Sequence, residues 1–495
     1  MKLQLRVALA VFAMLSSNAF AQDTFDAFRA KLQKDFADFQ NSEKRKYEEF
    51  RKKVNDDYSE IMTKAWEELQ AMKGVPCPKE DKPVPPKVFP DKDRDKIIKD
   101  TPKPIDIVVP IVKPEVQPNP IVPIEEEVSP KETVFDFTFM GTKLKVRLEP
   151  SCKFSLRGCS ESILSKQWKN MSDGKFNGTL SDCLDIRAKR HLCDWAYLSL
   201  LSTMAKCFFG SQCNEATLLT AYLYCQSGYK MRLAHNGGEL YMLYASKHIV
   251  YDCNYWILDG ENYYVFNAKC SQLNICQASF PNEKPLSLQM NTAQSFDMHK
   301  TESRALKSKR YPEVVASVST NKNLIQFYNT YPTSMVNEDF GTRWAIYANT
   351  PIEPTAQQSL YPALEKAISG LSQKEAVERL LNFVQTAFVY EYDDKVWGQD
   401  RAFFAEETLY YPYCDCEDRS ILFSHLVRDL VGLEVVLVYY PGHLATAVNF
   451  TEQVRGDNVV VNGKRYVVCD PTYIGAPVGL TMPEMDNSKA KVILL

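Results

Sequence analysis

Proline is concentrated in one stretch of this chain, and no other feature limits so strongly what the chain can fold into. Residues 76–130 contain 14 of the 27 prolines, in units such as the Pro-Val-Pro-Pro run at 83–86. Proline fixes φ and removes a backbone donor, so these residues cannot form a helix or a central strand. The stretch predicts an extended, proline-rich linker over residues 76–131 that acts as a spacer.

The segment before the linker is a candidate helix. Over residues 22–75, apolar side chains recur in steps of three and four, with charged residues between them. This period predicts an amphipathic, coiled-coil-type helix with an 11-residue repeat. Because a single helix with one apolar stripe needs a partner, the pattern favours self-association through residues 23–73. A helix that folds back on its own chain is the alternative.

The first 21 residues have the three parts of an export signal. A basic start precedes the apolar run from Val7 to Leu15, and Ala19-Phe20-Ala21 has the small-x-small form of a cleavage site. No other stretch approaches the ~18 uninterrupted apolar residues of a membrane-spanning helix. We therefore expect an exported protein, in the periplasm or outside the cell, without a transmembrane segment.

Composition describes a globular protein and argues against nucleic acid as a partner. The formal net charge is -3 and the hydrophobic content is 45%, whereas nucleic-acid binding usually needs a strongly basic surface. The remaining length, about three times the ~150 residues of a typical domain, has room for two or three domains. Alternating and helical patterns are mixed after the linker, which predicts an α+β protein with modules over residues 132–300 and 301–495.

Cysteine is unevenly distributed. Ten of the 14 cysteines lie between Cys152 and Cys276. In an oxidising compartment such a cluster predicts several disulfides, whose connectivity stays open; buried thiols that pack as small hydrophobes are the alternative. Because no paired CxxC motif is present, we do not expect a structural zinc ribbon. No sequence motif identifies another metal or a cofactor, so we expect none.

The richest chemistry lies near the C-terminus. An amphipathic helical pattern begins at Cys416 and stops at Gly432, and a thiol at a helix start is stabilised as a thiolate by unpaired backbone N–H groups. His443 opens the second of two adjacent strands, and Asp470 ends a later one. If the strands pair, the sequence predicts Cys416 as nucleophile, His443 as base and then acid, and Asp470 as the group that fixes the imidazole tautomer.

Each member also has a simpler interpretation. Cys416 would form a disulfide with Cys414 or Cys469, or a zinc site with Cys414 and His443. His443 would be a structural histidine, and Asp470 the start of a turn. Cys414 is the second candidate nucleophile, although it lies outside the helix start. Two residues are weak candidates for a side-chain oxyanion donor, or else surface residues: Gln385 and Gln399.

Four pieces of sequence together resemble the transglutaminase-like branch of the papain-like cysteine enzymes: Cys-Glu-Asp-Arg-Ser-Ile-Leu at 416–422, Gly432, Gly442-His443, and Asp-Pro-Thr at 470–472. The resemblance covers about residues 375–480. It implies an α+β, papain/transglutaminase-like catalytic domain and acyl transfer at amide bonds of a protein or peptide substrate, by a peptidase, amidase or transamidase. Cys414 and Leu444 depart from the family, which often has glycine and an aromatic residue at these positions. A catalytically silent peptide-binding or scaffold protein of the cell envelope is the alternative.

The Cys-rich module contains an echo of this pattern. Cys213 precedes a helical segment, Glu239 falls where His443 does, and Asn267 falls where Asp470 does. The copy has no histidine at the position of a base. The sequence therefore predicts a degenerate, structural or peptide-binding module over residues 132–300; chance similarity is the alternative.

Overall fold

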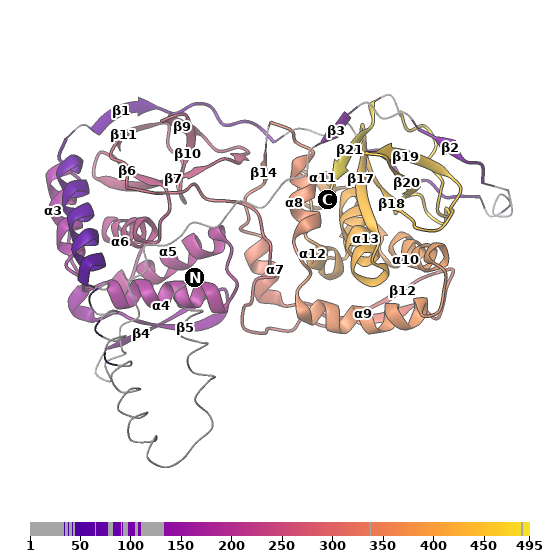
Figure 1. Ribbon diagram of the computed structural model, residues 1–495, viewed down its shortest axis with the longest axis horizontal. Coiled ribbons are helices and arrows are strands. Elements are labelled where there is room, and N and C mark those ends of the chain that lie inside the picture. The colour runs from indigo at the N-terminus through magenta and orange to yellow at the C-terminus, as the bar shows by residue number, and fades with distance from the viewer. Residues whose placement is uncertain are drawn as a thin grey trace, which may run out of the picture.

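A computed structural model shows a mixed α+β protein built from two halves that lie side by side (Figure 1). The structure describes residues 45–64, 66–77, 83–90, 98–103, 107–109, 133–336, 338–486 and 489–495, and the single positions 34, 38, 42 and 92. The expected export signal, residues 1–21, lies outside the described residues. Among those described, no helix has the length and apolarity that a membrane span needs.

The first half is a six-stranded antiparallel sheet with helices packed against it. Side by side, the strands are β1 (Trp66–Gln70), β11 (Gln272–Cys276), β6 (Met231–Asn236), β7 (Glu239–Ser246), β10 (Glu261–Val265) and β9 (Tyr255–Leu258). The helices are α3 (Glu161–Met171), α4 (Asn177–Lys189), α5 (Asp194–Phe209) and α6 (Asn214–Gln226). A hairpin of β4 (Val134–Phe139) and β5 (Thr142–Arg147) precedes them, with the expected alternation of buried and exposed residues.

The second half contains a seven-stranded sheet. Its order is β2 (Thr101–Pro102), β19 (Asp457–Val461), β20 (Lys464–Cys469), β18 (His443–Asn449), β17 (Glu434–Tyr440), β21 (Lys491–Leu494) and β3 (Ile107–Val109). The helices are α7 (Lys322–Tyr328), α8 (Thr342–Asn349), α9 (Pro354–Ile368), α10 (Gln373–Ala387), α11 (Asp393–Val396), α12 (Ala405–Tyr410) and α13 (Cys416–Val431). A hairpin of β12 (Arg304–Lys307) and β13 (Val315–Val318) also belongs to the second half.

Four short strands form two separate pairs outside the two main sheets. They are β8 (Ile249–Val250) with β14 (Ser334–Met335), and β15 (Val389–Tyr390) with β16 (Tyr413–Cys414).

The two halves repeat one topology. In each, a helix (α6 or α13) is followed by five strands of the main sheet, which lie in the order third, fourth, second, first, fifth, and every pairing among the five is antiparallel. The first hairpin has the same two-residue turn in both, so that Glu239 opposes Asn236 as His443 opposes Tyr440. Such agreement makes chance similarity a poor explanation of the echo.

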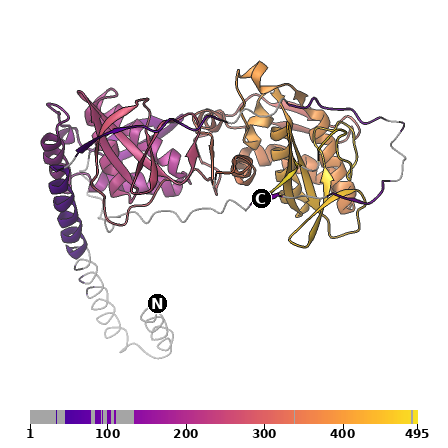
Figure 2. The same cartoon turned by 90° about the horizontal axis from the view of Figure 1, so that it is seen from above.

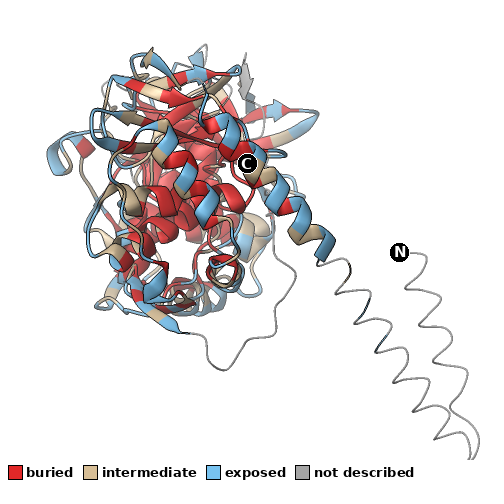
Figure 3. Cartoon of the chain, turned by 90° about the vertical axis from the view of Figure 1, so that its left-hand side faces the viewer, coloured by how far each residue is buried: buried red, intermediate tan, exposed pale blue. Residues whose placement is uncertain are grey.

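The N-terminal helix is shorter than predicted and folds back on its own chain. It is described from residue 45 to residue 62, with one side buried and one exposed (Figure 3). Tyr58 of the predicted stripe is buried together with Asn55 and Met62, whereas Phe50 and Ile61 of that stripe are about half exposed. The indole of Trp168 donates to Asn55 Oδ1 at 3.0 Å. The prediction of one helix over residues 22–75 is therefore wrong beyond residue 62. β1 forms instead, because the edge of β11 offers backbone hydrogen bonds that outweigh local helical preference.

The proline-rich segment is not a free spacer where it is described. β2 and β3 pair in parallel with the two outer strands β19 and β21, and residues 83–90 also contact the second half. Proline is tolerated at a sheet edge because only one side of an edge strand needs donors. In Figure 2 the indigo chain leaves the first half and runs along the second. The segment was predicted to be a spacer, but its described strands are part of the sheet of the second half.

None of the 14 cysteines forms a disulfide. The predicted disulfides are thus replaced by thiols, several of which are fully buried, including Cys183, Cys225 and Cys276. Burial raises the pKa of Cys276 to about 11 and that of Cys193 to about 12. These side chains behave as small apolar groups, which was the alternative interpretation.

Candidate functional site

Local sequence fixes the start and the end of α13. Asp415 is the N-cap, its backbone N–H donates to Asp418 Oδ2 at 3.2 Å, and Gly432 ends the helix with φ 73°. Carboxylates in the first turn suit the positive end of the helix dipole, and glycine accepts the left-handed conformation without strain. Cys416 is therefore the first helical residue, as the sequence predicted, and its side chain is 2% exposed.

His443 and Asp470 lie in direct contact. The Pro441-Gly442 turn places His443 at the start of β18, and β20 pairs with β18 so that Asp470 follows at its end. His443 Nε2 is 2.9 Å from Asp470 Oδ2, and each residue is 1% exposed. The other carboxylate oxygen accepts the backbone N–H of Thr472 and Tyr473 at 2.9 and 3.1 Å. The pair is thus fixed from both sides.

The start of α13 is held against the start of β18. Ser420, one helical turn after Cys416, donates its hydroxyl to the carbonyl of Leu444 at 2.8 Å, and Leu444 directly follows His443. The thiol of Cys416 donates to Glu417 Oε2 at 3.2 Å. His443 Nδ1 is buried and has no hydrogen-bond partner among the described residues. The structure thus joins two of the three predicted residues directly and places the third on the neighbouring helix end.

The structure also bears on the alternative interpretations of Cys416, Cys414 and Asp470. Cys416 forms no disulfide with Cys414 or Cys469. Cys414 is buried with its sulfur 3.9 Å from the carbonyl of Val389, and burial raises its pKa, which makes it a poor nucleophile. Asp470 does begin a turn, but it binds His443 at the same time.

The two glutamines that the sequence offered as oxyanion donors lie in different surroundings. The side-chain N–H₂ of Gln385, buried, donates to the carbonyls of Asp470, Tyr473 and Ala476 at 3.0, 2.8 and 3.1 Å. Its Oε1 accepts the N–H of Gly475 at 3.0 Å. Gln399 is exposed. Gln385 is therefore a positioning residue that holds the loop after Asp470, because all its polar atoms are already engaged.

A residue that sequence reasoning missed lies close to Cys416. Tyr390 is on β15, which pairs in parallel with β16 so that Tyr390 lies opposite Cys414. Its hydroxyl is buried without a hydrogen-bond partner among the described residues, and the Arg419 guanidinium lies 5.4 Å from its ring centre. Burial and then the charge of Cys416 raise its pKa far above the ordinary value, so the hydroxyl stays a neutral donor. The sequence carried no signal for it, because only the strand pairing brings it there.

Acidic side chains gather around the thiol. Carboxylate oxygens of Asp393, Asp400 and Glu417 lie within 4.8 Å of one another, and ligand atoms of Asp415, Cys416 and Glu417 do likewise. Burial, followed by the charges of Asp400 and Asp393, raises the pKa of Glu417 to about 7. Oxygen donors of this kind suit a hard cation such as Ca²⁺ or Mg²⁺. Neither group includes Cys414 or His443, which the alternative zinc site requires.

A basic side chain already balances part of this charge. Arg343, 1% exposed, has its Nη1 2.5 Å from Asp400 Oδ2. Asp415 Oδ1 and Glu417 Oε1 are buried without a hydrogen-bond partner in the described structure. Because ionised carboxylates at such distances repel, burial and mutual charge raise the pKa of Asp415 well above its ordinary value. Protons held on these acids therefore keep the surroundings of Cys416 close to neutral.

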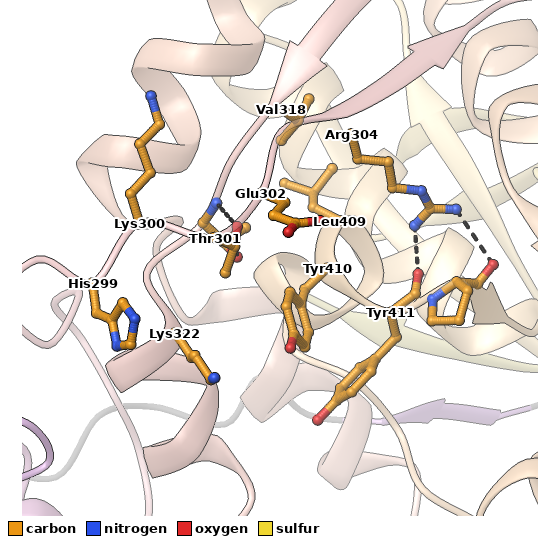
Figure 4. A pocket seen from close by; sticks show the side chains of 12 residues that line it. His299, Lys300, Thr301, Glu302, Arg304, Val318, Lys322, Leu409, Tyr410 and Tyr411 are labelled. Carbon is orange, nitrogen blue, oxygen red and sulfur yellow. Dashed lines mark hydrogen bonds between the residues drawn. The ribbon is translucent and has the colours of Figure 1, made fainter.

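A pocket in this half of the protein does not contain these residues. The pocket lies between the start of β12, the end of β13, the start of α7 and the end of α12 (Figure 4). Its volume is about 610 Å³. Arg304 closes one side, donating to the carbonyls of Tyr411 and Pro412. The pocket is lined by His299, Lys300, Thr301, Glu302, Arg304, Val318, Thr320, Lys322, Leu409, Tyr410, Tyr411 and Pro412. The three predicted catalytic residues are instead buried beneath the surface.

Comparison of the chain with models of protein families, with curated proteins and with solved structures gave no match. The function must therefore be argued from the geometry of the chain itself.

Proposed function

We propose that this protein is an exported, thiol-dependent acyl-transfer enzyme with a papain/transglutaminase-like catalytic domain, acting on amide bonds of proteins or peptides. The observation that carries the proposal is the 2.9 Å contact between His443 Nε2 and Asp470 Oδ2 beside a helix that begins with Cys416. A histidine fixed by a carboxylate through one nitrogen has the other nitrogen left to act as a base.

The roles follow from which nitrogen of His443 is bound to Asp470. Asp470 accepts the Nε2–H of His443, which leaves a lone pair on Nδ1. That lone pair takes the thiol proton of Cys416, and the thiolate attacks the amide carbonyl to form a tetrahedral intermediate. His443 then returns the proton to the leaving amine. Water or a second amine releases the acyl group from the resulting thioester.

Two sets of donors are available for the developing oxyanion. The first-turn N–H groups of a helix point out of its start, so those of α13 form one set, apart from the Asp418 N–H that the Asp415 side chain caps. The neutral hydroxyl of Tyr390 is the side-chain donor in place of Gln385 or Gln399. Before attack, the thiol proton of Cys416 must turn from Glu417 towards His443, because in the resting arrangement the thiol donates to the carboxylate.

A catalytically silent peptide-binding protein is the second candidate. It is favoured by the burial of Cys416, His443 and Asp470, which are 2%, 1% and 1% exposed. An enzyme with this site must open to admit a substrate, whereas a binding protein need not.

One experiment separates the two. A pool of peptides is incubated with the protein, with and without a primary amine, and the products are identified by mass spectrometry. An enzyme gives cleaved, deamidated or amine-linked products that disappear in Cys416→Ala. Cys414→Ala is the matched control, since Cys414 is an equally buried thiol two residues away, and it should keep most of the activity. Products that persist in Cys416→Ala would contradict the proposed nucleophile, and no products in any variant would favour the silent binding protein.

A further inference from the structure

Residues 83–90, which we call the strap, form an extended segment that binds both ends of the His443–Asp470 pair. The N–H of Val84 donates to the carbonyl of Gly442 at 2.9 Å, and Gly442 directly precedes His443. At the other end Ile474, four residues after Asp470, is bracketed by two bonds: its N–H donates to the carbonyl of Lys87 at 2.8 Å, and its carbonyl accepts the N–H of Phe89 at 2.9 Å. The strap therefore pairs through its backbone as an added strand does.

The strap turns two apolar side chains towards the protein and a third towards solvent. Val84 and Phe89 pack against a small cluster of Tyr473, Ala476 and Met482, and the Phe89 ring meets the Tyr473 ring edge-on at 5.7 Å. Val88, between the two backbone contacts, is 72% exposed. An extended peptide that is read by backbone bonds and by alternate side chains is the usual ligand of a peptide-binding edge.

The strap also makes a polar contact. Lys87 Nζ lies 2.6 Å from Glu484 Oε2 and donates to the carbonyl of Pro483 at 3.3 Å. Four of the eight residues in the strap are proline. Proline pre-sets an extended conformation, so little conformational entropy is lost when such a segment binds. The strap thus resembles a bound peptide, because it is extended, rich in proline and held by backbone and side-chain contacts to the second half.

We propose that the surface along Gly442, Ile474 and the Tyr473–Met482 cluster is a binding site for an extended, proline-containing peptide, and that the strap is its tethered ligand. A ligand from outside needs an aromatic residue at the place of Phe89 and a basic residue two positions earlier, opposite Glu484. The strap competes with such a peptide for the site. That the competing peptide is the substrate of Cys416 rests on the proposed function.

The test measures binding in a chain that cannot react. Full-length protein carrying Cys416→Ala is compared with the same protein carrying also Val84→Pro and Phe89→Ala. Val84→Pro removes the N–H that donates to Gly442 without disturbing an extended conformation. Phe89→Ala removes the ring that packs against Tyr473, Ala476 and Met482. A fluorescent peptide with the sequence of residues 83–90 is titrated into each, with fluorescence anisotropy as the readout. We expect it to bind the loosened chain about tenfold or more tightly than the unloosened one, since a tethered ligand acts at high effective concentration.

Matched peptides test the contacts. The peptide with Phe89→Ala should bind the loosened chain about tenfold more weakly, because an aromatic anchor supplies much of the affinity of such interfaces. The peptide with Val88→Ala should bind equally well. Lys87→Glu serves as a second loosened variant that alters only the surface, in case the first one does not fold. Equal binding to loosened and unloosened chains, or an absence of binding to either loosened variant, would overturn the proposal.

An activity assay tests the peptide-binding site and the proposed enzymatic function separately. Each loosened variant is also made with Cys416 intact and assayed against the peptide pool. Binding without products refutes the enzyme but keeps the site. Products without binding of the strap peptide keep the enzyme and refute the site. Faster product formation in the loosened chain than in the Val88→Ala chain supports both.

Discussion

His443 Nε2 and Asp470 Oδ2 lie 2.9 Å apart at the ends of two paired strands, although the residues are 27 positions apart in the chain. The carboxylate has two tasks there, because Oδ2 binds the imidazole while Oδ1 accepts the N–H groups of Thr472 and Tyr473. A substitution can therefore separate the proposed catalytic role of Asp470 from its structural role.

We predict that Asp470→Asn retains the fold but loses activity. The amide oxygen still accepts the two loop N–H groups, whereas the amide N–H₂ no longer accepts from His443 and favours the wrong imidazole tautomer. By analogy with serine enzymes, product formation should fall by about 10³- to 10⁴-fold. Thermal unfolding provides the control, since Asp470→Ala should lower both activity and the unfolding temperature. A loss of less than tenfold in Asp470→Asn would exclude Asp470 from the proposed mechanism.

Tyr390→Phe tests the side-chain oxyanion donor. We expect acyl transfer to slow by about 10²- to 10³-fold, the usual effect of removing one such donor. Alkylation of Cys416 by iodoacetamide should not change, because that reaction builds no oxyanion. Stability should not fall, since the buried hydroxyl has no partner among the described residues. Tyr392, whose ring lies 5.5 Å from that of Tyr390, provides the matched control as Tyr392→Phe. Equal slowing of alkylation in Tyr390→Phe would indicate a structural role instead.

Gln385→Leu should destabilise the loop that carries Asp470. The change removes the side-chain partner of three carbonyls and of the Gly475 N–H in a buried place, and among the described residues only the Tyr473 carbonyl keeps another donor, the N–H of Ala476. We expect the free energy of unfolding to fall by about 2–4 kcal/mol, as measured by chemical denaturation. Gln399→Leu at an exposed position should change it by less than about 0.5 kcal/mol. If Gln385→Leu proved as mild as its control, the loop would not depend on this side chain.

Stability should decrease as the pH rises from about 4.5 to 7, in part because of Glu406. Burial raises the pKa of this carboxyl to about 7 from an ordinary value of 4.5. The folded state therefore binds more protons than the unfolded state between these two values, and the stability conferred by the neutral acid is lost as the pH passes through the folded pKa. Glu406 accepts the N–H of Glu353 at 2.5 Å. Glu406→Gln keeps an acceptor there without a charge.

The measurement is the denaturation midpoint at several pH values between 4 and 8. Glu406→Gln should flatten its dependence on pH in that interval. Glu452→Gln, at an exposed position, should leave the dependence as it is. A slope that is identical in Glu406→Gln and the unaltered protein would assign the proton uptake to other groups, such as Glu407 and Glu417, whose pKa values are also raised to about 7 by burial.

The sequence was informative wherever short-range chemistry decides. The helix observed from Cys416 to Val431 was predicted closely, because acidic residues in the first turn and a final glycine act within one turn of the helix. The strands on either side of Pro441-Gly442 followed from a β-branched run and from turn residues, and the repeat in the Cys-rich module followed from the spacing of the same motif. The α+β class and the approach of Asp470 to His443 could therefore be anticipated.

The other features were decided by tertiary structure, because they depend on which surfaces of the chain pack together. Amphipathic spacing did not reveal that the N-terminal helix ends at residue 62 and buries Asn55, because that depends on Trp168 and its neighbours. Nor did it place Tyr390 near the thiol, engage Gln385 with three carbonyls, or lay the strap across Gly442. From its sequence, a proline-rich segment is predicted to be a free linker, because the sequence does not show whether a sheet edge lies near enough to pair with it. Periodicity along a chain records which face of an element is apolar, but only packing determines what covers that face.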